Sequence, residues 1–306
     1  YTISDGRWQE IQSLPVSLGE VTSLRRTSDG ATWVGSDGGL YLHRESDQYW
    51  TAIAPPDVGA WNRVNAILPL EDGSVWMGTN QGLVRAGANG VVDTLPAPDG
   101  RPFTEVTGVA RDGDGRLWVT SGARSEILRI DPDGRMQRLD ARTGLDHAQI
   151  HRVSIDAGGQ PWFLALDGVR PDGSPSPGGV FQYSEGRFAR WPPAAELPST
   201  RVYDMAEGPL GELYFGTGAG VAGYVEGTWR HWNRPTPLRA SQAFAIDVAP
   251  DGTVWFADRY RGVGRVEGDS ITYYTGSDVL PNDEVWDVLV DADSTVWAST
   301  QGGLAR

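Results

Sequence analysis

The sequence of 306 residues contains no cysteine and no lysine. The absence of cysteine excludes disulfide bonds, thiolate metal sites and cysteine nucleophiles. The absence of lysine excludes Schiff-base chemistry and makes all 26 basic residues arginine, whose planar guanidinium suits carboxylate, sulfate or phosphate partners. Against them stand 40 acidic residues, for a formal net charge of −14. Such a balance argues against a nucleic-acid partner, because phosphate binding needs a basic surface.

Long apolar segments and an initiating methionine are also missing. No apolar run approaches the roughly 18 residues that a membrane span needs, so no membrane insertion is expected in this segment. The sequence begins at Tyr1 without a signal-like segment. We therefore expect a trimmed mature domain or a fragment of a longer protein.

Glycine and a recurring aromatic residue are what the sequence has in excess. A turn followed by an aromatic residue recurs seven times, at spacings of 43, 42, 44, 52, 41 and 42 residues. A period of about 40–45 residues with four short strands is the size of one propeller blade. The marker aromatic residues are Trp33, Trp76, Trp118, Trp162, Tyr214, Trp255 and Trp297. They predict an all-β, seven-bladed β-propeller that spans residues 1–306 as one domain.

The repeats also predict the position of each strand. Innermost strands are expected to start near residues 21, 64, 106, 150, 202, 243 and 285, and the marker aromatic residues lie on the second strands. The seventh repeat stops after its third strand. We predict that residues 7–12 (RWQEIQ) complete this blade by pairing beside residues 302–305, because an open ring would leave unpaired strand edges.

The repeated aromatic residues and the Asp-Gly turns each have two interpretations. An aromatic residue at a fixed place in every blade is better explained by packing between blades than by ligand stacking. The Asp-Gly turns could be calcium loops, but their spacing favours two-residue hairpin turns in which glycine adopts positive φ.

Two families share these motifs. Residues 71–84 (EDGSVWMGTNQGLV) and 291–304 (DADSTVWASTQGGL) resemble the two-component regulator propeller repeats of bacterial signalling proteins. This resemblance implies an exported sensor domain, periplasmic or extracellular, that acts in signal transduction. Blade six, PDGTVWFADRYRGVGRV, is instead similar to the seven-bladed virginiamycin B lyase family. That family relies on histidines and a glutamate at the channel mouth, with a divalent metal.

The catalytic positions of the lyase family are only partly present. Phe244 stands at the position of the blade-six histidine, and Asp258 replaces the glutamate. His151 occupies the equivalent position in blade four. His151 as a general acid with Asp258 as its partner is the weak catalytic candidate that the resemblance allows.

Two rings of residues flank the first apolar residue of each innermost strand, and strand alternation places both rings on one side. The first is Glu20, Arg63, Glu105, Gln149, Arg201, Gln242 and Glu284; the second is Thr22, Asn65, Thr107, His151, Tyr203, Phe244 and Trp286. The second ring changes from polar in blades one to three to aromatic in blades five to seven. Such a mixture suits a small ligand. Alternatively, these residues bind no ligand: they are polar because they are exposed to solvent, and the aromatic rings pack on neighbouring loops.

Several arginines are predicted at the same mouth, where they would attract an anionic ligand. Trp61, Arg101, Arg239, Arg259, Tyr260 and Arg261 come from loops that lead to it. The insertion at residues 167–179 is either a lid over this mouth or a solvated excursion. The predicted ligand-binding residues are Arg63, Glu105, His151, Arg201, Tyr203, Phe244, Arg259, Tyr260, Glu284 and Trp286.

The function that these features favour is a non-catalytic sensor or recognition propeller. Its expected partner is a small polar molecule, anionic or glycan-like, bound at one channel mouth without a cofactor or metal. Two alternatives remain open at this point. One is a metal-assisted lyase or hydrolase of the virginiamycin B lyase type, and the other is a scaffold that binds other protein domains.

Overall fold

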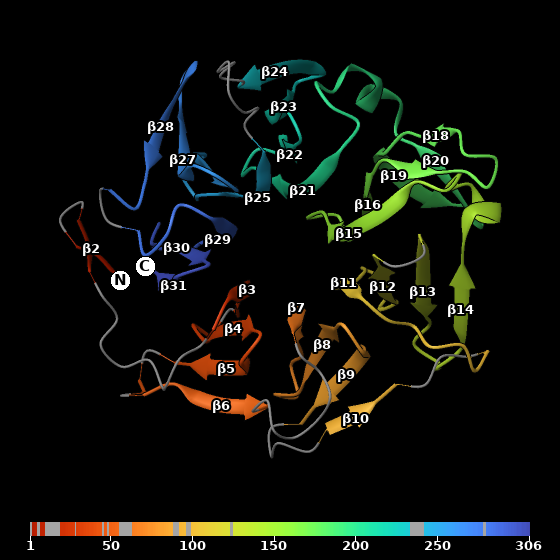
Figure 1. Ribbon diagram of the computed structural model, residues 1–306, viewed down its shortest axis with the longest axis horizontal. Helices are drawn as coiled ribbons and strands as arrows, with labels where there is room; N and C mark the ends of the chain where they lie inside the picture. The colour runs from red at the N-terminus through yellow and green to blue at the C-terminus, as the bar shows by residue number, and fades with distance from the viewer. Residues whose placement is uncertain are drawn as a thin grey trace.

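Seven antiparallel sheets are arranged radially about a common axis, as Figure 1 shows. The computed structural model describes residues 2–4, 7–9, 19–27, 29–44, 46–47, 49–54, 63–87, 92–95, 99–122, 125–232, 242–277 and 280–306. The predicted seven-bladed β-propeller is confirmed, and blades one to six have four strands each. Six innermost strands begin at the predicted residue, and the fourth begins one residue earlier, at Gln149.

The strands follow the chain from the innermost to the outermost position of each blade. Blade one contains β3 (Val21–Arg26), β4 (Thr32–Ser36), β5 (Gly39–His43) and β6 (Thr51–Ala54). Blade two contains β7 (Val64–Pro69), β8 (Val75–Thr79), β9 (Gly82–Ala86) and β10 (Val92–Thr94). Blade three contains β11 (Val106–Arg111), β12 (Leu117–Ser121), β13 (Glu126–Ile130) and β14 (Met136–Leu139). Blade four contains β15 (Gln149–Ile155), β16 (Pro161–Leu166), β19 (Gly179–Ser184) and β20 (Arg187–Arg190).

The remaining blades repeat this order. Blade five contains β21 (Val202–Glu207), β22 (Leu213–Thr217), β23 (Gly220–Val225) and β24 (Thr228–Trp232). Blade six contains β25 (Ala243–Val248), β26 (Val254–Asp258), β27 (Gly262–Glu267) and β28 (Ser270–Tyr274). Blade seven contains β29 (Val285–Val290), β30 (Val296–Thr300) and β31 (Gly303–Ala305). Two 3₁₀ turns, η2 (Ala141–Thr143) and η3 (Pro192–Glu196), are the helices of the described residues, and neither could cross a membrane.

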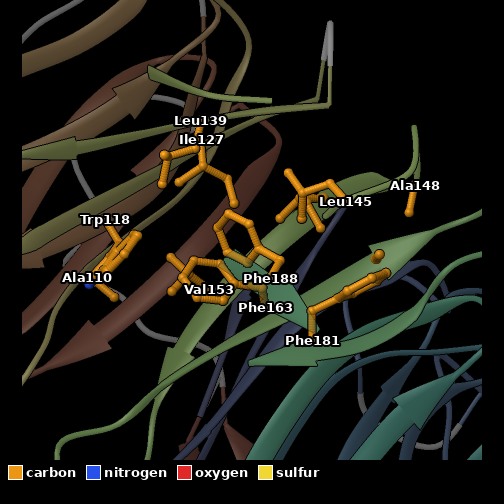
Figure 2. Packing of buried hydrophobic residues seen from close by; sticks show 12 residues of the cluster. Ala110, Trp118, Ile127, Leu139, Leu145, Ala148, Val153, Phe163, Phe181 and Phe188 are labelled. Atoms are coloured by element: carbon orange, nitrogen blue, oxygen red, sulfur yellow. The ribbon is translucent and has the colours of Figure 1, made fainter. Parts of the chain in front are cut away.

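The core lies between adjacent blades, and the marker aromatic residues belong to it. Figure 2 shows Trp118 of blade three beside Phe163 and Phe188 of blade four. Six of the seven marker residues are buried, and Trp76 is partly buried. Three indole Nε1 groups donate to an aspartate six residues earlier, and these pairs are Trp118–Asp112, Trp162–Asp156 and Trp297–Asp291. The packing interpretation of the marker residues is therefore confirmed.

The turns between the first two strands have three residues, so the predicted two-residue turns are wrong. In blade two, Leu70 N donates to Ser74 O at 2.8 Å, with residues 71–73 between them. Gly73 closes the turn with φ of +77°. A type I turn followed by a left-handed residue gives this geometry. The predicted positive φ of glycine is confirmed, and six blades have glycine at this position.

Blade seven has Ser294 at the turn position that glycine occupies in the other six blades, and its φ is +65°. The Cβ of an L-residue disfavours this conformation. We expect Ser294→Gly to raise the free energy of unfolding by about 0.5–1 kcal/mol. Urea unfolding measures this change. Gly252→Ser, which makes the reverse change at the same turn of blade six, should lower it by a similar amount, and effects of equal sign would contradict the explanation.

The N-terminal segment does not complete blade seven in the way that the sequence predicts. Residues Arg7–Gln9 form β2, which pairs with β1 (Thr2–Ser4) in a separate two-stranded sheet outside the ring in Figure 1. Residues 10–12 lie outside the described residues. β1 and β2 are two residues apart in sequence, so their pairing closes a far shorter loop than pairing with residues 302–305 would.

Blade seven packs directly on blade one across the closing seam. Asp287 Oδ2 of β29 accepts a hydrogen bond from Leu24 N of β3 at 2.9 Å. Arg26 Nε lies 2.6 Å from Asp291 Oδ1. Below these polar contacts, Trp297 of blade seven packs in one cluster with buried apolar residues of blade one. Among the described residues, these side-chain contacts join the two ends of the ring of blades.

Candidate functional site

A cavity of about 640 Å³ lies at the end of the ring where the innermost strands begin; we call it the mouth cavity. Its walls come from six of the seven blades. The lining residues are Thr22, Arg63, Asn65, Asn80, Gln81, Glu105, Thr107, His151, Arg152, Phe244 and Trp286. The structure thus brings together six members of the predicted second ring, together with Arg63 and Glu105 of the first. The turn residues Asn80 and Gln81 were missed, although their place after the second strand of blade two was a usable signal.

Blades one to three supply the polar half of the mouth cavity. Thr22 Oγ1 donates to Val64 O of the next blade at 2.5 Å. Asn65 Nδ2 donates to Asn80 Oδ1 at 2.9 Å and to Val106 O at 3.1 Å. These bonds fix the side chains between blades. Asn65 Oδ1 and Asn80 Nδ2 have no partner among the described residues, so both can bind a polar ligand.

Blades four to seven supply an aromatic half. Tyr203 stacks on Phe244 with ring centroids 4.3 Å apart and an interplanar angle of 18°. Phe244 meets Trp286 nearly at a right angle, at 5.8 Å. His151 meets Tyr203 edge-on at 6.1 Å. The aromatic rings therefore contact one another from blade to blade.

Tyr203 supports this aromatic half from behind. It is 1% exposed and does not line the mouth cavity. Burial raises the pKa of its phenol, and the nearby Arg201 opposes that rise. The alternation of residues along the strand indicated the side on which Tyr203 lies. It did not indicate how deeply the side chain is buried, which depends on how closely Phe244 covers the aromatic ring of Tyr203. Tyr203 can therefore act on a ligand only by holding Phe244 in place.

The arginines of the mouth are already paired with acids or rings. Arg63 donates both Nη atoms to Glu20 at 3.3 Å, and Arg259 Nε lies 3.7 Å from Glu284. Arg259 also lies over Phe244 and Trp286 at 5.2 and 4.9 Å. Since carboxylates neutralise these cations, the contacts give little support to the predicted positive field.

Three other predicted arginines, Arg101, Arg201 and Arg261, do not line the mouth cavity. Arg201 is exposed and lies over Tyr203 at 5.6 Å. Arg101 pairs with Asp99 at 2.8 Å, and Arg261 lies 6.0 Å from the ring of Tyr273 on the outermost strand of blade six. Trp61 and Arg239 lie outside the described residues. The insertion forms a two-stranded hairpin, β17 (Gly168–Val169) and β18 (Pro175–Ser176), and none of its residues lines the mouth cavity.

Glu105 lies at the mouth in a strained backbone conformation. Its φ is +51°, which is uncommon for a residue other than glycine. Two hydrogen bonds hold it there, from Glu105 N to Asn80 O and from Gly122 N to Glu105 O. Strain of this kind persists where surrounding contacts impose it and is concentrated at functional sites.

The two catalytic candidates are not brought together. His151 lines the mouth cavity, where burial and the charge of Arg152 lower its pKa to about 4. The imidazole is therefore neutral at pH 7. Asp258 is 1% exposed and accepts hydrogen bonds from Tyr260 N and the Tyr273 hydroxyl. In the described part of the chain, no group of three or more acidic, histidine or cysteine residues is arranged to hold a metal ion.

A second cavity, of about 660 Å³, lies at the opposite end among the hairpin turns; we call it the turn-side cavity. Asp204, Asp247 and Asp287 line it with Arg25 and Arg152. Arg152 Nη1 lies 2.7 Å from Asp204 Oδ2 and also lines the mouth cavity, so it separates the two cavities. Charged residues inside otherwise apolar innermost strands were the signal that sequence reasoning missed.

Each of these aspartates ties its own blade to the next. Asp204 accepts a hydrogen bond from Ile246 N at 3.1 Å, Asp247 from Val290 N at 2.7 Å, and Asp287 from Leu24 N at 2.9 Å. Burial raises the pKa of Asp287 and raises that of Asp247 to about 6. The aspartates are therefore accounted for by the joining of blades five, six, seven and one.

Acidification should change the contributions of Asp247 and His151 to the free energy of unfolding in opposite directions. The pKa of Asp247 is raised by folding, so its contribution is favourable at low pH and is lost as pH rises through about 6. The pKa of His151 is lowered to about 4, so protonation of the unfolded state destabilises the fold as pH falls below about 6.5. Relative to the wild type, we expect acidification from pH 8 to 5 to cost Asp247→Asn about 1 kcal/mol more and His151→Asn about 2 kcal/mol less. Urea unfolding at both pH values measures these differences, and shifts of the same sign in the two variants would contradict the assignments.

Comparison with solved structures supports the propeller fold. No protein-family model and no curated protein sequence matches the chain. The extracellular domain of a putative hybrid two component system from B. thetaiotaomicron is similar with a TM-score of 0.77 and 16% identity, covering 100% of this chain and 39% of that one. A second such domain has a TM-score of 0.68 and 16% identity, covering 98% and 41%. Virginiamycin B lyase from Staphylococcus aureus has a TM-score of 0.71 and 17% identity, covering 98% and 97%. The chain thus spans about two fifths of the two-component-system chains and nearly all of the lyase.

Proposed function

We propose that this propeller is the ligand-recognition part of an exported bacterial sensor, periplasmic or extracellular, and that it binds a small polar ligand in the mouth cavity. The observation that carries the proposal is the convergence of six blades on one cavity with a polar half and an aromatic half. A concave site with a few oriented polar groups and apolar walls is the usual form of a small-molecule site. Similarity to extracellular domains of two-component systems supports the sensor role and the location.

The polar half favours a hydroxyl-rich, glycan-like ligand over an anion. Its groups are amides and hydroxyls, which both donate and accept hydrogen bonds. Glu105 adds a carboxylate that accepts from hydroxyl groups. An anion would have to separate Arg63 from Glu20, to which it is bonded through both Nη atoms. A neutral polyol can bind without breaking that pair.

Asn65→Ala should weaken the best ligand of a mono- and oligosaccharide panel at least tenfold, because it removes the amide that spans blades two and three. Thermal shift identifies the ligand and isothermal titration measures its affinity. Gln160→Ala, at an exposed turn of the opposite end, is the control and should bind as the wild type does. Undiminished binding to Asn65→Ala would place the ligand elsewhere and refute the mouth as its site.

A lyase or hydrolase activity at the same mouth is a second candidate. Similarity to virginiamycin B lyase extends over nearly the whole of both chains, and His151 lines the cavity. Cleavage of quinupristin in the presence of Mg²⁺, lost in His151→Ala, would establish the lyase activity. An unchanged rate in that variant would exclude His151 from the reaction.

A further inference from the structure

Arg259 occupies an aromatic cage at the junction of blades six and seven. Its Cζ lies 4.9 Å from the ring centroid of Trp286, 5.2 Å from that of Phe244 and 5.5 Å from that of Tyr260. Glu284 adds a carboxylate oxygen 3.7 Å from Nε. Three aromatic rings and one carboxylate around a single cation form the arrangement in which proteins bind quaternary ammonium groups.

The guanidinium of Arg259 is poorly matched to this environment. A guanidinium carries five N–H donors, yet that of Arg259 forms no hydrogen bond with a described residue, and its Nε is buried. Arg63, which also lies over the Trp286 ring at 5.7 Å, instead donates both Nη atoms to Glu20. A buried donor without an acceptor costs free energy. The cage therefore attracts the charge of Arg259 but does not satisfy its donors.

A trimethylammonium group fits the same surroundings without that cost. It carries a positive charge and no N–H donor, and its methyl groups can contact the rings directly. Phe244 and Trp286 form part of the cage and also line the mouth cavity. A ligand held in the cage by its ammonium group can therefore extend the rest of its structure toward the polar half.

Arg259 can leave the cage by rotation of its side chain. It lies in the turn of residues 259–261 between β26 and β27, and its side chain is 34% exposed. The main chain is anchored independently, because Arg259 N donates to Gln242 O at 3.2 Å. Rotation of the side chain into solvent breaks no main-chain hydrogen bond.

We propose that this cage binds the quaternary ammonium group of a small ligand, which displaces the Arg259 side chain. The proposal rests on the mouth being the ligand site, and it assigns a chemical class to part of the ligand. Arg259 is then the internal occupant of the cage in the free protein and is exposed when the ligand binds.

Isothermal titration with tetramethylammonium and choline tests the proposal on the whole chain. The wild type should bind both weakly, and Arg259→Ala should bind tetramethylammonium at least tenfold more tightly because no side chain has to be displaced. Adding Trp286→Leu to Arg259→Ala should reverse this gain. The neutral choline analogue 3,3-dimethyl-1-butanol should bind at least tenfold more weakly than choline. Arg265→Ala, which removes an arginine over Trp255 away from the mouth, should behave as the wild type.

Three results would overturn the proposal: no ammonium binding to Arg259→Ala, equal binding of the neutral analogue, or binding to that variant with none to the wild type. Failure of the cage and failure of the mouth are separate outcomes. If a saccharide binds the wild type but not Asn65→Ala, and no ammonium compound binds, the cage is refuted and the mouth is retained as a ligand site. If Arg259→Ala binds ammonium compounds more tightly but Asn65→Ala weakens the binding of no ligand, the cage is retained and the polar half is refuted as a ligand site.

Discussion

Replacing Arg152 by methionine should lower the free energy of unfolding by about 3–5 kcal/mol. Its guanidinium lies 2.7 Å from Asp204, and both side chains are largely buried between the two cavities. The charge of Arg152 also acts on Asp287, the pKa of which burial raises. Methionine keeps much of the volume but leaves these carboxylates without their buried cation. The cost of an unpaired buried charge then exceeds any gain from the apolar side chain.

The pH dependence of this loss distinguishes charge from packing. Arg152 lowers the pKa of Asp287, so without this cation the folded-state pKa of Asp287 should rise further. A raised carboxyl pKa adds stability as pH falls. Arg152→Met should therefore recover part of its loss between pH 8 and 5 in urea unfolding experiments. Arg25→Met is the matched control, because Arg25 is 39% exposed and lies 4.0 Å from Asp287; its cost should stay below about 1 kcal/mol. A pH-independent loss in Arg152→Met would attribute the effect to packing.

The blades could be predicted from sequence because each repeat encodes its own strands and turns. The marker aromatic residue and the apolar start of the innermost strand are local signals that recur in all seven repeats, and the turn glycine recurs in six of them. They fix the register, and the register places Thr22, Asn65 and Trp286 around one mouth. This part of the site follows from strand alternation alone.

The contacts between blades could not be predicted in the same way. Whether Tyr203 faces the ligand depends on Phe244 of the next blade, which stacks on it. Whether the Trp286 ring is open depends on Arg259, which reaches it from blade six. The pairing of β1 with β2 closes a short loop, whereas the predicted pairing joins residues far apart in the sequence, at the edge of blade seven. In each case the partner lies in another blade or segment, and no repeat position encodes it.

Contacts between blades should contribute most to stability at the closing seam between blades seven and one. Asp291 is 3% exposed and accepts a hydrogen bond from Trp297 Nε1 at 2.9 Å, and its other oxygen lies 2.6 Å from Arg26 Nε of blade one. We expect Asp291→Ala to lower the free energy of unfolding by about 3 kcal/mol, because it leaves a buried indole N–H unpaired and removes the ion pair across the seam.

Asp156 provides the matched control for this seam, because it makes the same bond to Trp162 at 2.9 Å in blade four but has no arginine partner among the described residues. Asp156→Ala should therefore cost only about 1–2 kcal/mol. Hydrogen exchange locates the difference, since Asp291→Ala should speed exchange in β3, β4 and β29–β31 while blades three and four stay protected. Equal costs in the two variants, or exchange that rises evenly around the ring, would show that the seam is no weaker than any other junction. An excess cost with exchange confined to blades seven and one would instead show that side chains, and not a shared blade, hold this ring closed.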